Sequence, residues 1–395
     1  MNGFQRLAWS CAAVGSSILT VLALTALGSE TRGPLSAVLE QAGTVVSGLE
    51  GRVVRLFRGR GREAKLDWFA PYRRDAARLR NPDRVLLGAY DGGIPHTLQG
   101  VVRVEEALGT TLPLVQFYGA WGDKPEQQFP LRLAQAAWEM GSVPVITWEP
   151  WLTDFENRLH PHLPLRDRRD RGGLAGIARG DYDFYVDAWA AEAAAFGKPL
   201  FVRFGHEMND PYRYPWGPHN NRPEDFVAAW RHVVERFRKA GAENVIWVWS
   251  PHVAYEGYEW FYPGDDVVDW VATGALNYGT VAYWSRWWSF HDIFGKHYER
   301  LAGFGKPVMV AEFGTLSVGG DRQAWLREAL AELPARYPAV KALLFFHVAG
   351  DATVTYQKLD WSFAADTAAS RTIRDAIRPW APGAPSPAGA PSPAR

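Results

Sequence analysis

Eight short apolar segments are spaced along the middle of the chain, and they limit the folds open to it. Most are nearly continuous runs of aliphatic and aromatic residues, as expected for strands buried on both faces of a parallel sheet. Glycine, proline or polar turns bound each of them. The segments are Arg84–Tyr90, Leu112–Tyr118, Val143–Trp148, Leu200–His206, Asn244–Trp249, Val268–Asn277, Pro307–Glu312 and Val340–His347.

Helical patterns separate these segments. The clearest is Phe226–Ala240, which follows acidic residues and is closed by Gly241; Tyr182–Phe196 and Gln323–Leu333 are similar. Eight strands alternating with helices over residues 67–380 predict an α/β fold, a (β/α)₈ or TIM barrel. An open doubly wound sheet is the alternative, but no glycine-rich phosphate motif follows the first strand.

The two ends of the chain differ from the barrel. Residues 7–28 carry no charge and follow Arg6, so 1–29 is predicted to be a signal peptide or signal anchor. Residues 30–66 join an apolar helical pattern to a basic cluster, which predicts a linker or membrane-surface helix. The Pro/Ala/Ser-rich tail, 381–395, is expected to be disordered. The protein is therefore expected to be secreted or held at the cell envelope, with membrane contact through an uncleaved N-terminal segment.

Composition narrows the possible partners. Net charge is zero, which gives no sign of nucleic acid. The single cysteine, Cys11, lies in the N-terminal apolar segment, so no disulfide or thiolate metal site is expected in the barrel. Nor is the segment from His206 a zinc motif, because Asp210 stands where a second histidine is needed. We expect a monomeric barrel without cofactor or metal.

Aromatic residues are abundant, with 19 Trp, 15 Tyr and 20 Phe in 395 residues. Such a content fits an aromatic core or platforms on which sugar rings stack. Polar and aromatic residues also gather at the ends of the apolar segments, where barrels of this kind carry their chemistry. Candidate contacts, each with a packing role as the alternative, are Asp91, Tyr118, Trp121, Trp148, Glu149, Trp151, Trp249, His252, Trp284, Trp287 and Trp288.

Two glutamates are the strongest candidates for catalysis. Glu207 follows the fourth apolar segment and Glu312 ends the seventh, each between strand-like sequence and aromatic residues. A retaining glycosidase needs a protonated carboxyl and a nucleophilic carboxylate roughly 5 Å apart. Because the ends of strands four and seven can face each other across the barrel, the pair predicts cleavage of a glycosidic bond.

Three groups of motifs surround these glutamates. They are Arg203–Asn209 with Tyr214–Gly217, then Asn277–Gly279, and Ala311–Gly314. Together they resemble the acid/base motif, the sixth-strand tyrosine segment and the nucleophile motif of glycoside hydrolase family 26. That family contains β-mannanases and β-1,3-1,4-glucanases, and the resemblance covers residues 67–380.

The resemblance implies a retaining mechanism in which Glu207 is the general acid/base and Glu312 the nucleophile. It implies that His206 and Tyr278 orient this pair, with the tyrosine hydrogen-bonded to the nucleophile. It also implies that Trp216 is a sugar platform near the cleaved bond.

Three further site residues either support the glutamates or depart from the family pattern. Arg203 lies about 13 Å before Glu207 along an ideal strand, so a supporting or packing role is expected. Arg213, beside Tyr212, stands where the family often has Trp, and His347 ends the eighth segment where related barrels commonly have Trp. Both changes fall where the substrate would lie, so β-mannan and β-glucan remain alternatives.

The sequence thus predicts an exported retaining endo-β-glycanase that hydrolyses β-1,4-linked hexose polysaccharide. A non-catalytic carbohydrate-binding barrel is one alternative, although binding alone does not need paired acids. The other is a membrane-tethered accessory factor in exopolysaccharide processing that works through residues 30–66.

Overall fold

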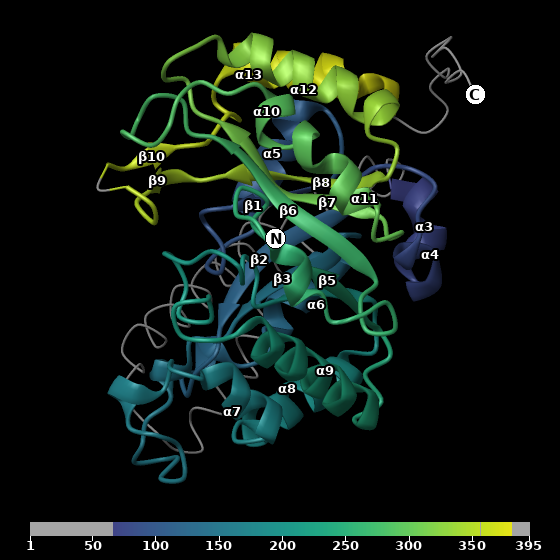
Figure 1. Cartoon of the computed structure of the whole chain (residues 1–395). Coiled ribbons are helices and arrows are strands. Elements are labelled where there is room, and N and C mark those ends of the chain that lie inside the picture. The colour runs from purple at the N-terminus through teal and green to yellow at the C-terminus, as the bar shows by residue number, and fades with distance from the viewer. Residues whose placement is uncertain (1–65, 356, 381–395) are drawn as a thin grey trace, which may run out of the picture.

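The eight predicted strands form a closed parallel barrel (Figure 1), which confirms the (β/α)₈ prediction. The computed structural model describes residues 66–355 and 357–380; the predicted export segment, almost all of the linker and the tail lie outside them. Each strand pairs with the next, and β8 closes the barrel against β1. The strands are β1 (Leu86–Asp91), β2 (Leu114–Ala120), β3 (Val143–Glu149), β4 (Leu200–Phe204), β5 (Val245–Trp249), β6 (Trp270–Asn277), β7 (Val308–Thr315) and β8 (Val340–His347).

Helices surround the barrel, and a small antiparallel pair of strands, β9 (Ala349–Asp351) and β10 (Leu359–Asp360), follows β8. Local signals set several helix ends: Pro223 begins α9, and α5 and α8 end at Gly109 and Gly197 with φ of 64° and 62°. The helices are α3 (Ala70–Arg73), α4 (Ala76–Arg80), α5 (Gln99–Leu108), α6 (Leu131–Glu139), α7 (Gly173–Arg179), α8 (Asp183–Phe196), α9 (Pro223–Lys239), α10 (Phe290–Ile293), α11 (Tyr298–Ala302), α12 (Arg322–Arg336) and α13 (Thr367–Ile377).

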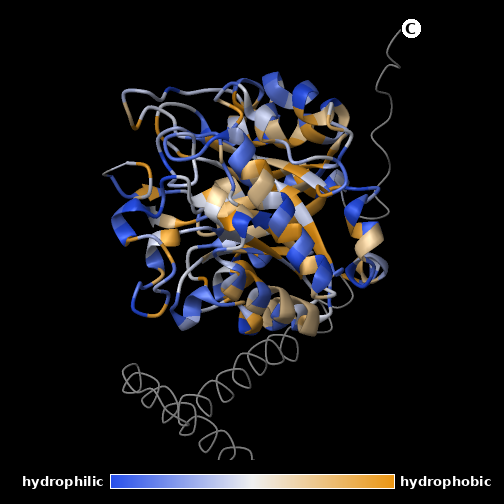
Figure 2. Cartoon of the chain, turned by 60° about the horizontal axis from the view of Figure 1, so that its bottom comes forward, coloured by the Kyte–Doolittle hydropathy of each residue, from blue (hydrophilic) through white to orange (hydrophobic). Residues whose placement is uncertain are grey.

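Alternation along each strand divides the core into two layers. On β4, Phe201 belongs to the cluster inside the barrel, whereas Val202 and Phe204 belong to the cluster between barrel and helices. Figure 2 shows the hydrophobic strands in orange at the centre and helices of mixed colour around them. Which layer a residue joins is therefore decided by its position within the strand.

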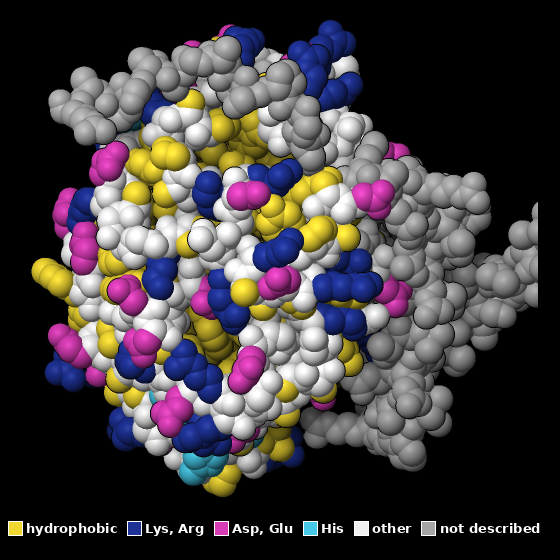
Figure 3. Space-filling view, turned by 90° about the vertical axis from the view of Figure 1, so that its right-hand side faces the viewer, with side chains coloured by type: hydrophobic (Ala, Val, Ile, Leu, Met, Phe, Trp, Pro, Cys, Tyr) yellow, Lys and Arg dark blue, Asp and Glu magenta, His cyan; other side chains and the backbone are white. Residues whose placement is uncertain are grey.

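The segment before β1 closes the N-terminal end of the barrel. Leu66, Phe69 and Leu79 join the inner cluster, and the Trp270 indole N–H donates to the Leu79 carbonyl at 2.9 Å. On the face that carries α3 and α4, charged side chains of both signs are scattered among hydrophobic ones (Figure 3). With this end plugged, the C-terminal mouth is left for a site.

A β-bulge interrupts β7 at Ala311 and Glu312. On the β6 side, Thr273 pairs with Val310 and Gly274 with Glu312, so Ala311 is passed over. Such an extra residue re-aims the side chains that follow it. The bulge turns Glu312 into the barrel. The strand continues to Thr315, so the prediction that Glu312 ends the seventh strand was wrong.

None of the helices that the structure describes is long and apolar enough to cross a membrane.

Candidate active site

A buried ion pair occupies the barrel interior below the mouth. Arg203, on β4, donates through Nη2 to Glu312 Oε1 at 2.6 Å, and the Tyr118 hydroxyl, from β2, donates to the same oxygen at 2.7 Å. The Arg203 side chain is 1% exposed and is held at Nε by the Thr147 hydroxyl at 2.9 Å. Arg203 therefore binds Glu312 directly, which agrees with a supporting role and not with packing alone.

The surroundings of Glu312 favour its charged form. Burial alone would raise the pKa of this carboxyl, but the charge of Arg203 and the hydrogen bonds from Arg203 and Tyr118 outweigh burial and lower the pKa. Burial and the nearby Glu312 raise the pKa of Tyr118 well above its ordinary value, so its hydroxyl stays a donor. Both bonds use Oε1, which leaves Oε2 of Glu312 without a hydrogen bond.

Glu207 sits in a strained turn three residues after β4. Its φ is 52°, and among the described residues it is the one non-glycine residue with a positive φ. Its N–H donates to the Ser250 carbonyl at 2.7 Å, which holds the turn against the end of β5. A left-handed conformation costs a non-glycine residue about 1–2 kcal/mol. Strain of this kind is concentrated at functional sites.

The two glutamates approach one point, Glu312 from β7 and Glu207 from the turn after β4. A Cβ added to Gly274 on β6 would lie 3.8 Å from Glu207 Oε1 and 3.9 Å from Glu312 Cβ. Both side chains are buried, each 9% exposed. The predicted proximity of these glutamates therefore agrees with the geometry, and Gly274, which sequence reasoning missed, keeps the space between them open.

His206 lies in a buried polar group beside Glu207. Its Nε2 is 2.9 Å from the Tyr214 hydroxyl, and its Nδ1 is 3.8 Å from a carboxylate oxygen of Glu149 on β3. Burial, with the charges of Arg203 and Arg213, lowers the pKa of His206 well below its usual value, so the imidazole is neutral. Burial raises the pKa of Glu149, although the Trp151 indole N–H donates to it at 3.0 Å.

The predicted role of Tyr278 was wrong in one respect. Its hydroxyl makes no hydrogen bond to Glu312; the ring packs against Trp361 and Trp284, with centroids 4.9 and 5.2 Å away. The tyrosine that binds Glu312 is Tyr118. Tyr278 still faces the mouth, since both glutamates and Arg213 act on it electrostatically.

Three tryptophans predicted to contact sugar are core residues. Trp121, Trp148 and Trp249 have no exposed surface. Their indoles pack in the layer between the barrel and its helices, Trp148 against Trp189 with centroids 4.5 Å apart. Because Thr147 points into the barrel, its neighbour Trp148 must point outwards.

Two further substrate contacts are corrected in the same way. Trp216 is 2% exposed and lies under the ring of Tyr214, 4.5 Å away and nearly parallel, while its indole N–H donates to the His206 carbonyl at 2.8 Å. His347 is buried, bonded through Nδ1 to Asp91 at 2.7 Å, and accepts at Nε2 from the Ala364 N–H. Trp216 supports Tyr214, and His347 joins β8 to β1.

The other predicted contacts keep some exposed surface. Tyr212 is 85% exposed and Trp284 is 41% exposed, whereas Trp151 and Trp287 are partly buried. Trp151 packs edge-on against Trp216, and Trp287 lies against the backbone of Gly320. Tyr212 and Trp284 are therefore the predicted platforms with a ring surface free for a sugar.

Arg213 reaches across the mouth. Its Nη1 lies 3.5 Å from Glu207 Oε2, and its Nη2 donates to the Thr353 hydroxyl, between β9 and β10, at 3.3 Å. Burial opposes the charge of this guanidinium, but Glu207 and other negative groups raise its pKa above the ordinary value.

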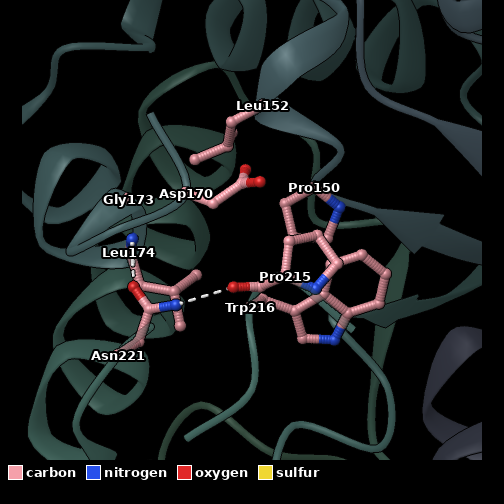
Figure 4. Close-up of a pocket in the computed structure, with 8 residues that line it drawn as sticks. All are labelled: Pro150, Leu152, Asp170, Gly173, Leu174, Pro215, Trp216 and Asn221. Carbon is pink, nitrogen blue, oxygen red and sulfur yellow. Dashed lines mark hydrogen bonds between the residues drawn. The ribbon is translucent and has the colours of Figure 1, made fainter. Parts of the chain in front are cut away.

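A small pocket lies beside this group (Figure 4). It has an empty volume of about 150 Å³ and is lined by Pro150, Leu152, Asp170, Gly173, Leu174, Pro215, Trp216 and Asn221. Neither glutamate lines it, and ligand pockets usually hold about 300 Å³ or more. The pocket is therefore a packing gap behind Trp216 and not the sugar cleft.

Glu207, Asp210 and His252 place one potential metal-ligand atom each within 4.8 Å of one another. His252 Nδ1, however, accepts a hydrogen bond from the Ala254 N–H at 3.3 Å. The proton of a neutral His252 is then on Nε2, which makes that atom a donor and not a metal ligand. The absence of a metal stays a prediction.

A (β/α)₈ barrel with two buried glutamates at its C-terminal mouth is the architecture of glycoside hydrolases that use paired carboxylates. A family model described as glycosyl hydrolase family 26 matches residues 185–304. The chain is 30% identical over 300 residues to Endoglucanase H of Acetivibrio thermocellus, a match that covers 74% of this chain and 30% of that protein. These matches support glycoside hydrolase family 26 as the family that the chain resembles.

Two other similarities were found, one of sequence and one of fold. A mannan endo-1,4-β-mannosidase of Bacillus subtilis is 22% identical over 326 residues, 75% of this chain and 80% of that protein. The structure of a family 26 β-mannanase from Bacteroides ovatus superposes with a TM-score of 0.55 at 17% identity, covering 77% of this chain and 91% of that one. The latter likeness is one of fold.

The left-handed turn at Glu207 predicts an order of stability. Glu207→Gly should unfold with a free energy about 1 kcal/mol higher than Glu207→Ala, because glycine adopts a positive φ without strain. Urea denaturation of the two variants measures the difference. At Glu149, within a regular strand, glycine should be the less stable of the same two replacements. If alanine were the more stable at both positions, the turn would not be strained.

The Arg203–Glu312 pair predicts a pH-dependent stability. Arg203→Leu leaves a buried carboxylate unpaired and should lower the free energy of unfolding at neutral pH by about 3–5 kcal/mol. The folded pKa of Glu312 is lowered, so the stabilisation in the wild type is complete above the unfolded value of about 4.3 and is lost as pH falls towards the folded pKa. The gap between wild type and variant should therefore narrow in acid.

Denaturation curves between neutral and acidic pH measure this gap. Arg213→Leu is the matched control, since the Arg213 side chain is 29% exposed and should contribute less. A gap for Arg203→Leu that stays constant with pH would contradict the assignment.

Proposed function

We propose that the chain is a retaining endo-β-glycanase that hydrolyses β-1,4-linked hexose polysaccharide, with Glu312 as nucleophile and Glu207 as general acid/base. The observation that carries the proposal is the contrast between the two carboxyls. Arg203 and Tyr118 hold Glu312 in its charged form, whereas Glu207 stands in a strained turn against the same glycine, Gly274. Two carboxyls with different roles are what double displacement needs.

Glu312 is arranged for attack on an anomeric carbon. Its Oε1 is occupied by two hydrogen bonds from inside the barrel, so Oε2 carries the lone pair free to attack. Covalent bond formation neutralises the carboxylate, and Arg203 then steadies the carboxylate when it leaves again. The fixed donors need no reorganisation during either step.

Glu207 would first give its proton to the leaving oxygen and then take one from the attacking water. Glu207 Oε1 and Glu312 Cβ both lie within 4 Å of a Cβ built on Gly274, which is compatible with the short carboxyl separation of a retaining enzyme, about 5–5.5 Å. Neutral His206 and the Tyr214 hydroxyl form the wall beside Glu207 and offer hydrogen bonds without adding charge.

The relatives support two substrates. One is named an endoglucanase and the other a mannan endo-1,4-β-mannosidase, so β-glucan and β-mannan both stay within the proposal. Tyr212 and Trp284 supply exposed rings at the mouth for stacking. The uncharged segment 7–28 supports export to the cell envelope or beyond.

Hydrolysis is tested by release of reducing sugar from mannan, glucomannan, mixed-linkage glucan, xylan and cellulose. Glu207→Ala should lower the rate by about 10²–10⁴-fold through loss of proton transfer, and Glu312→Ala should lower it at least as much. NMR of the first product should show retained anomeric configuration. Turnover that is equal in wild type and both variants would refute the assignment, and initial inversion would refute the role of Glu312.

The two tyrosines give a matched comparison. Tyr118→Phe removes a hydrogen bond to the charged Glu312 and should lower kcat by about ten- to a hundredfold, the value of a charge-assisted bond. Tyr278→Phe removes a hydroxyl without such a bond and should have a smaller effect on kcat. Steady-state kinetics on one polymer measure both, and the reverse order would show that Tyr278 contacts the nucleophile during turnover.

A further inference from the structure

Arg213 places a positive charge at the mouth of the site, directly beside the proposed acid/base. Its guanidinium lies between Glu207 on one side and Thr353 of the β9–β10 loop on the other. It also lies over the ring of Tyr214, 5.1 Å from the centroid. Thr353 is itself fixed, because its hydroxyl donates to Asp351 at 2.7 Å. The charge is therefore held in place from both sides of the mouth.

The hydrogen-bonding capacity of Arg213 is incompletely used. A guanidinium has five N–H donors, and charge-assisted bonds are usually about 2.7–2.9 Å long. Within the described part of the chain, Arg213 makes two polar contacts, at 3.5 Å to Glu207 and 3.3 Å to Thr353. Arg203, by contrast, is 1% exposed and makes short bonds inside the barrel. With its side chain 29% exposed, Arg213 has donors free to face a ligand.

The other exposed groups at the mouth recognise sugar rings but not charge. Tyr212 and Trp284 offer aromatic faces, and Tyr278 contributes a third ring. The whole chain has a net charge of zero, so general attraction of an acidic polymer is not expected. Directly beside Glu207, discrimination by charge would therefore depend on the guanidinium of Arg213.

We propose that Arg213 binds a carboxylate on a sugar unit next to the cleaved bond, so that the preferred substrate is an acidic β-glycan containing hexuronic acid units. The planar fork of a guanidinium matches a carboxylate with two parallel hydrogen bonds. Such a substrate would replace the long contact to Glu207 with two short ones. This inference rests on the proposed glycanase function and narrows its substrate class.

The test compares polymers that differ only at C6 of their sugar units. Mixed-linkage glucan and mannan are each assayed beside the same polymer oxidised at C6 to the uronate. Wild type should show a kcat/KM at least about tenfold higher on the oxidised form, the factor expected for one charge-assisted hydrogen bond. Arg213→Gln should lose that preference, and Arg213→Lys should keep part of it.

A matched control separates this contact from the charge of the surface. Arg327 is exposed on α12, one of the helices that surround the barrel. Arg327→Gln removes the same charge at a different place and should leave the preference unchanged. A wild type that cuts neutral and oxidised polymers equally, or an Arg213→Gln variant that keeps the preference, would overturn the proposal.

Binding distinguishes failure of this inference from failure of the hydrolase function. If no polymer is cut, affinity electrophoresis of wild type in gels that contain neutral or oxidised polymer decides the matter. Tighter binding of the oxidised polymer that is lost in Arg213→Gln would sustain the inference while the hydrolase function fails. Equal retardation by the two polymers would overturn the inference.

Discussion

The site depends on a guanidinium buried inside the barrel. Arg203 occupies a position where most barrels of this kind place aliphatic side chains. A buried charge is tolerated when it is paired and its donors are bonded, and Arg203 meets this condition with groups from several strands. The polar interior therefore has one consistent arrangement. That arrangement fixes the direction of the Glu312 side chain and assigns its Oε1 to the two hydrogen bonds. It also keeps the carboxyl charged.

Glu207 is positioned by different means. No strand holds it; a turn with a positive φ and one backbone hydrogen bond to Ser250 do so. Such a turn can keep the backbone in position while the side chain remains free of short bonds, which suits the proposed acid/base, a group that would exchange a proton twice. The two carboxyls thus differ in rigidity as well as in charge, although both lie against Gly274.

The fold could be predicted because nearly continuous apolar runs are specific for a parallel sheet, and because the helices between them begin and end at clear signals. The proximity of the glutamates followed from the barrel. The prediction that buried tryptophans contact sugar was wrong for a physical reason. Closeness to the end of a strand does not tell which way a side chain points. Counting along β3 would have placed Thr147 and Glu149 inside and Trp148 outside. The same count places Tyr118 inside, and it was the tyrosine missed as the partner of Glu312.

The same alternation, counted along β7 from Val310, would have placed Glu312 outside the barrel. The alternation is broken there, because Val310 and Phe313 both belong to the outer layer although they are three residues apart. The pattern of apolar and polar residues along the sequence does not reveal the extra residue in β7. Its position is set by the pairing of β7 with β6 and β8, which are distant in sequence.

The bulge has a consequence for how this segment can change. Val310 and Phe313 both point outwards, and Glu312 directly precedes Phe313. Loss of Ala311 would therefore restore a regular strand and still leave the carboxylate inside the barrel. Loss of the bulge with every residue kept would instead continue the alternation from Val310 and turn Glu312 towards the helices. At this point β7 can lose a residue more safely than it can lose its irregularity.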